Sequence, residues 1–354
     1  MIFITLPKKP NWREEMYTIY IRLLLLTLIS FTTALNATEP LKNSEPNTWY
    51  FDRFNLYFED DIYSQTDDNY SAGERFSFLF FIENEDYALY NLLFLDYDKT
   101  YSYATFSLTN QIFTPTDTNA TELIVDDRPY AGWTYFEAGI HKTSKNHLRS
   151  LLLKVGMIGE YAFSEQLQNG VHKLINNDPA RGWDNQLNNE LGINLKYTHK
   201  WIFLSEDYHG FESSIVPFAS AELGNVAINA EAGAFVRLGW NIPKDFGVSS
   251  VDLGADPGIP NYNEYQDRLL HHWSFSINLA AAGSAVARDI FLDGNTFTDS
   301  HSVEKENFIY YYGFGMTLRY QRFVLDFLQV QNSKKFELEK KGHGVGTIIV
   351  SWLF

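Results

Sequence analysis

From about residue 50 onward, apolar and polar side chains alternate along segments of roughly ten residues. In residues 312–320, for example, Tyr312, Phe314, Met316 and Leu318 alternate with small or polar side chains. Successive side chains of a β-strand point to opposite sides of the sheet, so this pattern predicts strands with one apolar and one polar face. The same alternation recurs in residues 150–157, 193–198, 230–240 and 273–279.

Two features favour a membrane barrel over a soluble sandwich, whose outward face would be polar. The apolar faces carry Tyr or Trp near their ends, as the interfacial girdles of membrane barrels do. The basic residues Lys154, Lys196, Arg237 and Arg319 fall on the opposite faces, where a hydrated lumen would hold them. The last strand closes on Phe354, an ending that resembles the C-terminal signature of bacterial outer-membrane barrels. Because unpaired backbone groups are very costly in lipid, we predict an all-β fold, a closed transmembrane antiparallel β-barrel.

The segments between the predicted strands differ in length. Residues 242–265 contain Pro243, Pro257 and Pro260 together with several glycines, and this composition predicts a long exposed loop. Residues 321–322 instead predict a tight turn between two strands. Long loops on one side and short turns on the other are typical of transmembrane barrels.

The N-terminal residues 1–37 predict a secretory signal peptide, followed by a barrel domain at 38–354. An apolar run at 23–31 follows Arg22, and small residues come after it, with Ala34 and Ala37 as the two candidate cleavage points. The run is shorter than the roughly 20 apolar residues of a membrane-spanning helix. An uncleaved anchor is the alternative interpretation.

Composition narrows the class of partner. The chain of 354 residues has no cysteine, which excludes disulfides and thiolate metal sites. Aromatic residues make up 16% of the chain although its mean hydropathy is −0.25, a combination that fits walls with one apolar side. The net charge of −16 argues against nucleic acid, because phosphate binding needs a basic footprint. It does not exclude an anionic lipid, because local patches govern that contact.

Residues 59–73 (EDDIYSQTDDNYSAG) are the first of three stretches with candidate chemistry. Hard cations prefer several oxygen ligands, and carboxylates supply them. The spacing is not that of an EF-hand loop, and a solvated acidic loop is the alternative. The stretch contains five acidic residues: Glu59, Asp60, Asp61, Asp67 and Asp68.

The second stretch is residues 126–133 (DDRPYAGW). Arg128 beside two aspartates could form ion pairs in the lumen, and Pro129 with Gly132 predicts a fixed turn. Structural support is the interpretation that we favour for this stretch.

The third stretch, residues 164–190, carries a histidine. Gln168 and His172 are four residues apart, so a helix would place both side chains on one face. The glycine at 170 and the polar run after it predict that such a helix is short. Histidine suits general-base catalysis near neutral pH, whereas a solvated or structural histidine is the alternative.

Together these stretches resemble the lipid A 3'-O-deacylase family of outer-membrane barrels, over most of the mature chain. Residues 59–73 match the family's E-N-D-x-[FY]-x-x-T-D-x-x-Y-[TS]-x-G stretch, and residues 126–133 match D-D-R-P-Y-A-G-W in full. Residues 168–172 match Q-N-x-x-H, and residues 182–187 match G-W-x-x-Q-L. Residues 288–303 (RDIFLDGNTFTDSHSV) also look like the family's.

The resemblance implies a barrel of about twelve strands with short helical segments in its loops. It implies a calcium-dependent ester hydrolase site between the lumen and the outer leaflet. His172 would be the base that activates a water molecule, and Asp61 would bind Ca²⁺. Ser71 and Gln168 match active-site positions. Asp60 stands where the family usually has asparagine, and its carboxylate is a second candidate ligand for the metal.

The implied substrate is lipid A, from which a 3'-linked acyl or acyloxyacyl chain is released. Lipopolysaccharide and outer-membrane lipids are therefore the expected partners, and the enzyme is expected to be a monomer in the bacterial outer membrane.

Two other functions stay open on the sequence. The first is a catalytically inert barrel with a structural or binding role, because Asp60 replaces asparagine and residues 114–125 lack a lysine that some members have. The second is an outer-membrane phospholipase A with Ser-His-Asn chemistry. No serine here has neighbours that mark it as an activated nucleophile.

Overall fold

The computed structural model describes residues 49–60, 69–83, 88–93, 99–175, 177–247, 258–261 and 273–354. The unit that contains the barrel extends from Pro46 to Phe354. The predicted signal peptide at 1–37 lies outside the described residues.

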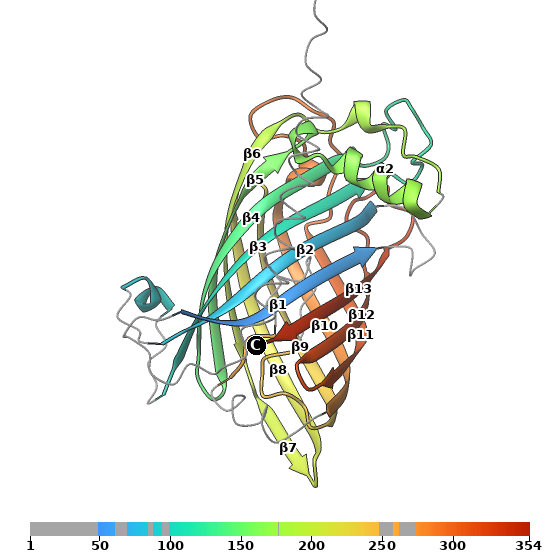
Figure 1. The fold of residues 1–354 in the computed structure, drawn as a ribbon. Coiled ribbons are helices and arrows are strands. Elements are labelled where there is room, and N and C mark those ends of the chain that lie inside the picture. Colours follow the sequence, from blue (N-terminus) through green and yellow to red (C-terminus); the bar gives the residue numbers. More distant parts are fainter. Residues whose placement is uncertain are drawn as a thin grey trace, which may run out of the picture. The chain divides into compact units, whose positions relative to one another are not determined.

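The described strands form a closed, twelve-stranded antiparallel barrel (Figure 1). Apart from β6 and β7, each described strand pairs with its neighbours in the chain, and the first strand pairs with the last. β6 and β7 both pair with β8 and together take the place of one strand. The thirteen described strand segments therefore form a twelve-stranded barrel. The predicted fold class is therefore confirmed. The strands are β1 (Trp49–Asp60), β2 (Asn69–Ile82), β3 (Tyr101–Thr114), β4 (Ala131–Thr143), β5 (His147–Ile158), β6 (Glu190–Trp201), β7 (Leu204–Tyr208), β8 (Phe211–Gly224), β9 (Ala227–Trp240), β10 (Trp273–Asp289), β11 (Phe308–Tyr320), β12 (Phe323–Asn332) and β13 (Gly344–Leu353).

The two rims of the barrel carry different connections. We call the rim at which helix α2 (Ser164–Ile175) lies the helix rim, and the opposite rim, near the C-terminal residue Phe354, the terminal rim (Figure 1). The helix rim also carries three short helices: η3 (Glu160–Ala162), η4 (Trp183–Asn185) and α4 (Ile290–Asp293). The segment η2 (Ala88–Leu93) lies at the terminal rim. Among the described residues, no helix is long and apolar enough to cross a membrane.

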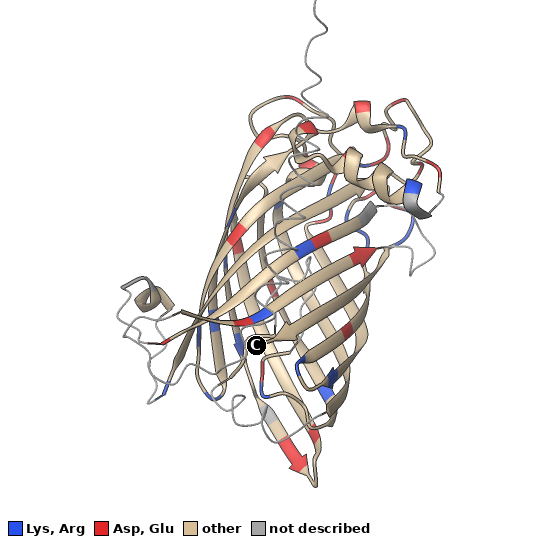
Figure 2. Cartoon of the chain, in the orientation of Figure 1, with Lys and Arg blue, Asp and Glu red and all other residues tan. Residues whose placement is uncertain are grey.

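The outward face of the wall is apolar, as the alternation predicts. The outward side chains of β11 are all exposed: Tyr310, Tyr312, Phe314, Met316, Leu318 and Tyr320. Three tryptophans, Trp49, Trp240 and Trp273, are exposed at the strand ends of the terminal rim, where an aromatic girdle is expected. Most of the strand length carries no charge (Figure 2).

The inward face is polar and internally paired. The basic residues that the alternation assigns to the lumen are buried there, and two of them form ion pairs. The lumen pairs among the described residues include Lys154–Glu222 at 2.9 Å, Arg237–Asp245 at 2.7 Å and Arg75–Glu137 at 2.6 Å. Charged side chains in a narrow lumen are stable because opposite charges lie within hydrogen-bonding distance.

The predicted exposed loop at 242–265 is wrong for the residues that the structure describes. Ile242, Phe246 and Ile259 are buried, and the last two belong to a core cluster built from inward side chains of many strands. This loop also leaves the barrel at the same rim as the tight turn at 321–322, so long and short connections are not segregated as predicted. Apolar side chains in a proline- and glycine-rich segment gain by burial, and the lumen offers the space. We call the described parts of this segment, 242–247 and 258–261, the lumen plug.

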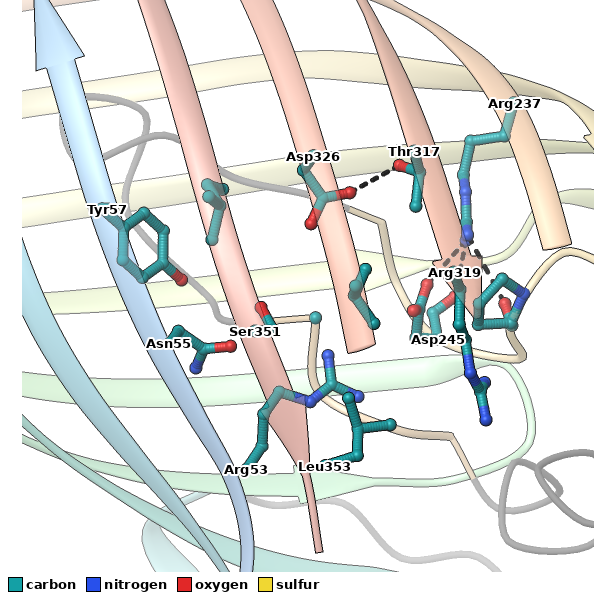
Figure 3. A pocket seen from close by; sticks show the side chains of 14 residues that line it. Arg53, Asn55, Tyr57, Arg237, Asp245, Thr317, Arg319, Asp326, Ser351 and Leu353 are labelled. Carbon is teal, nitrogen blue, oxygen red and sulfur yellow. Dashed lines mark hydrogen bonds and ion pairs between the residues drawn. The ribbon is translucent and has the colours of Figure 1, made fainter. Parts of the chain in front are cut away.

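A small cavity of about 30 Å³ remains between the lumen plug and the wall (Figure 3). Its polar side chains largely satisfy one another: Arg237 donates to Asp245 at 2.7 Å, and Thr317 donates to Asp326 at 2.6 Å. A space of this size suits about one water molecule. None of the candidate site residues lines it. The cavity is therefore a small space left where the lumen plug packs against the wall, and it is separate from the candidate site.

Candidate active site

Helix α2 confirms the predicted short helix and packs against β3 and β4 at the helix rim. Asn110 on β3 anchors the first residue of α2 and the preceding η3, because its Nδ2 donates to Ser164 Oγ at 2.8 Å and to Ala162 O at 3.3 Å. Thr134 on β4 donates to the same Ala162 O at 2.6 Å. Asn110 and Thr134 lie directly opposite each other in the sheet. Two strands and the helix are thus joined by one polar network.

This network lies on the outward face of the wall. Leu108 and Phe136, two residues away from the network along β3 and β4, are 37% and 50% exposed. Gly132 belongs to the same outward set, and a Cβ there would lie 2.2 Å from Ser164 Oγ and 2.4 Å from Ser164 Cβ. The prediction of a turn at Gly132 is wrong, because β4 already includes this residue. The glycine is needed for the close approach of the helix.

The remainder of the 126–133 stretch builds the entry into β4. Arg128 is buried, and its guanidinium lies 4.9 Å from the centre of the Phe113 ring. Asp127 accepts the backbone N–H groups of Thr116 and Arg128, both at 2.8 Å. Asp126 is exposed. Asp127 therefore caps backbone groups and Asp126 faces solvent, whereas the buried Arg128 guanidinium interacts electrostatically with the carboxylate of Asp289. These contacts agree with the structural role that we favoured.

His172 lies in the last turn of α2 and is only 8% exposed. Its Nδ1 lies 2.6 Å from the backbone oxygen of Asp178, in the segment that follows the helix. A carbonyl oxygen only accepts hydrogen bonds, so Nδ1 must carry the ring proton. In the neutral tautomer with this contact, Nε2 is the nitrogen without a proton, which is the form that a general base requires.

Gln168 lies one helical turn before His172 and is also buried. Its Oε1 accepts a hydrogen bond from the indole Nε1 of Trp183 at 2.9 Å. The neighbouring Asn169 exchanges two hydrogen bonds with the backbone of Ala180, at 2.9 and 3.3 Å. The segment after the helix is therefore fastened back onto it. Trp183 belongs to a cluster that we call the rim cluster: Ile112, Tyr130, Ala180 and Trp183.

The end of β1 approaches this helix through β2. Asp60 lies directly opposite Ala72, and Ala72 packs against the rim cluster. Asp60 belongs to the outward set of β1, because Phe58 is 46% exposed. Ser71 is the extra residue of a bulge between β2 and β3, a device that redirects side chains next to functional sites. The side chain of Ser71, and Asp61 altogether, lie outside the described residues.

Sequence reasoning did not single out Glu74, which belongs to the same outward set as Ala72. Glu74 lies opposite Phe58 and diagonal to Asp60, close enough for the two carboxylates to repel each other. An acidic residue among apolar outward positions was a signal that the alternation already offered. Neighbouring carboxylates fit a hard cation such as Ca²⁺, which prefers oxygen ligands. The described residues hold no cluster of three His, Cys, Asp or Glu side chains that could bind a metal, so amide or backbone oxygens, or Asp61, would have to complete the site.

Solved structures resemble this fold to different degrees. LpxR from Salmonella typhimurium superposes with a TM-score of 0.70 at 17% identity, covering 85% of this chain and 100% of that one. The β domain of the Bordetella autotransporter BrkA covers 88% and 99% with a TM-score of 0.38 at 6% identity. The translocator domain of NalP from Neisseria meningitidis covers 96% and 98% with a TM-score of 0.37 at 9% identity. The search of curated protein sequences found no match.

The family comparison extends over nearly the whole sequence. Residues 23–354 match the family described as outer membrane protein LpxR. The match includes the four motifs on which the resemblance was based, as well as the strands that close the barrel. The chain therefore belongs to the LpxR family of outer-membrane β-barrels, the lipid A deacylase family that its motifs resemble.

Proposed function

We propose that this protein hydrolyses the 3'-linked acyl or acyloxyacyl ester of lipid A, with His172 as general base and Ca²⁺ as cofactor. Family membership supports the reaction class. The observation that carries the role of His172 is the 2.6 Å contact between its Nδ1 and the Asp178 carbonyl oxygen. That contact fixes the tautomer and the orientation of the ring, as a carboxylate does in other hydrolases.

The proposed reaction divides one water molecule between two products. His172 Nε2 takes a proton from the water, and the water oxygen forms a bond to the ester carbonyl carbon. When the tetrahedral intermediate collapses, the bond between that carbon and the sugar oxygen breaks. The imidazolium then returns the proton to the sugar oxygen. The acyl chain leaves as a carboxylic acid, and no serine nucleophile is needed.

Other residues of the chain position this histidine. Gln168, which accepts a hydrogen bond from Trp183, fixes the helical turn that precedes His172. Calcium, when bound, supplies a positive charge that polarises the ester carbonyl and stabilises the oxyanion. Asp60 would bind it from the end of β1, and Asp61 is the ligand that the family resemblance implies. Ser71 adjoins Asp60 through the bulge in β2.

The position of the site suits a membrane lipid as substrate. The helix, the polar network and Asp60 lie on the outward face of the wall, whereas the lumen is filled by ion pairs and the lumen plug. A lipid that diffuses in the leaflet meets the outward face directly. The proposed function requires no partner chain and no passage through the barrel.

The test is the mass spectrum of lipid A from Gram-negative cells that do or do not express the protein. We expect the loss of one 3'-linked acyl or acyloxyacyl group. His172→Ala and removal of Ca²⁺ with EGTA should each abolish this loss. His209→Asn is the matched control, because His209 lies in a turn at the terminal rim and asparagine tolerates its positive φ of 53°. Unchanged lipid A with the wild-type protein would refute the proposal and favour an inert barrel.

A phospholipase A would behave differently in the same cells. It would release fatty acids from phospholipids, and a serine-directed reagent would inactivate it. The proposed hydrolase should resist that reagent while it remains sensitive to EGTA.

A further inference from the structure

We propose that Glu74 and Asn110 supply two additional oxygen ligands to the cation site, next to Asp60. This inference rests on the proposed function, since it extends the metal site that the hydrolase would use. It assigns a ligand role to two residues on neighbouring strands that the motif analysis did not identify.

The two residues form a directly opposed pair between β2 and β3. Both belong to the outward set of their strands, so their Cβ atoms lie about 4.5–5.5 Å apart. Glu74 Oε2 and Asn110 Oδ1 are both buried, and neither oxygen has a hydrogen-bond partner in the described structure. Two unsatisfied acceptors on facing side chains are costly unless a cation or a proton lies between them.

One neighbour, the backbone oxygen of Ala162, favours the observed orientation of the Asn110 amide. Its Nδ2, which carries two hydrogens, lies within hydrogen-bonding distance of the backbone oxygen of Ala162, which can only accept, and of the hydroxyls Ser164 Oγ and Thr134 Oγ1. A flipped amide would place Oδ1 3.3 Å from that carbonyl oxygen, but Oδ1 could still accept from the two hydroxyls and Nδ2 would turn toward Glu74. The flipped amide is therefore one metal-free arrangement, and it predicts no Ca²⁺ binding by Glu74. Asn110 is only 4% exposed, so Oδ1 is held away from solvent on the side opposite to the helix anchor.

Asp60 completes the arrangement from a third strand. It lies diagonal to Glu74 across β1 and β2, and the two carboxylates interact electrostatically. Carboxylate and amide oxygens are the ligands that Ca²⁺ prefers, and three neighbouring strands bring them to adjacent levels of the outward face. The second metal-free arrangement is a protonated Glu74 that donates its O–H to Asn110 Oδ1. It would satisfy both oxygens without a metal.

Calcium titration of the purified full-length chain in detergent micelles separates the metal site from both metal-free arrangements. Glu74→Gln keeps the shape of the side chain and can donate to Asn110 Oδ1, but it removes the charge. If Glu74 is a ligand, calorimetry should show Ca²⁺ affinity reduced at least about tenfold in this variant. Glu231→Gln is the matched control, because this lumen residue accepts a hydrogen bond from Tyr311 and should bind Ca²⁺ as the wild type does.

The outcomes distinguish this inference from the proposed function. Unchanged affinity in Glu74→Gln, or a wild-type protein that binds no Ca²⁺, overturns the ligand role. Reduced affinity supports it even if lipid A is never modified. If lipid A is deacylated, saturating Ca²⁺ should restore activity to Glu74→Gln. Should that variant fail to fold, Glu74→Leu replaces it, because an apolar side chain suits an outward position, and the same reading applies.

Discussion

Substitution of Gly132 by alanine tests whether the docking of α2 on the wall controls the proposed catalysis. The added Cβ would lie 2.2 Å from Ser164 Oγ and 2.4 Å from Ser164 Cβ. Rotation of the serine side chain relieves the first contact and leaves the second, so the backbone at the start of the helix must move. Ordinary van der Waals contact begins near 3.4 Å, so the required displacement is about 1 Å. Overpacking of this kind costs about 1–3 kcal/mol.

The displaced element carries His172 and Gln168, so the strain is transmitted to the proposed base. A misplacement of about 1 Å at a catalytic group costs about 100-fold in rate. We therefore expect Gly132→Ala to lower the rate of lipid A deacylation by about two orders of magnitude. The strands themselves should stay closed, because the clash lies on the outward face. The assay is single-turnover release of fatty acid from lipid A in mixed micelles, with heat-modifiable gel mobility as the check of barrel folding.

Two further variants make this experiment decisive. Gly170→Ala adds the same methyl group to the middle of α2, where no atom lies within 4 Å, and it should leave the rate unchanged. It should also favour the helix by about 0.5–1 kcal/mol. Gly132→Ala combined with Ser164→Gly removes the clashing atoms and should recover part of the rate. Full activity in Gly132→Ala, with a normally folded barrel, would refute the link between helix docking and catalysis.

Two other predictions concern buried contacts. Trp183→Phe removes the indole donor and leaves Gln168 Oε1 buried without a partner, at a cost of about 1–3 kcal/mol, so kcat/KM should fall roughly 5- to 150-fold. The lipid-facing variant Trp240→Phe is the control. Equal kcat/KM values in the two variants would contradict the positioning role of Trp183. Arg75→Met leaves Glu137 unpaired in the lumen, and the urea midpoint of the folded barrel should fall by the equivalent of about 3–5 kcal/mol. Adding Glu137→Met should restore most of the loss, and a double variant as unstable as the single one would count against the ion pair as the cause.

The barrel was predictable because most strands show the alternation of apolar and polar residues in their own sequence. Alternation along the strands assigns Lys154 and Arg237 to the lumen, and both are buried there in ion pairs. The closing strand and the turn at 321–322 follow equally local patterns. A lipid-exposed wall imposes an apolar residue at nearly every second position, so the sequence of a membrane barrel records its fold with little ambiguity.

The connections were less predictable because their positions depend on tertiary contacts. Proline and glycine mark 242–265 correctly as irregular, but nothing local shows that Phe246 and Ile259 fill the lumen. Gly132 carries a turn-like signal, yet the reason for it is the approach of a helix more than thirty residues later. Distances between segments far apart in sequence are set by packing, and single-residue preferences do not contain them.

The candidate site was predicted in part. Gln168 and His172 lie one turn apart on a helix, as their spacing indicates, and this helix packs against β3 and β4. The tautomer of the histidine was not predictable, because it depends on a backbone carbonyl at Asp178. Glu74 and Asn110 were overlooked, although each is a polar residue in an otherwise apolar outward row. Such interruptions are informative because lipid exposure makes them expensive.

The polar residues in the outward rows and the helix α2 that packs over them explain each other's presence. A polar outward residue near the middle of a lipid-facing wall would lose its hydrogen bonds to water and find no partner in the acyl chains. Asn110 and Thr134 avoid this loss because the first residues of α2 cover them and accept or donate their hydrogen bonds. Gln168 and His172, which lie further along the same helix, are also buried. A polar pocket on the outside of a barrel therefore requires a connection that folds back over the wall, and a hydrolase that acts on a membrane lipid requires such a pocket.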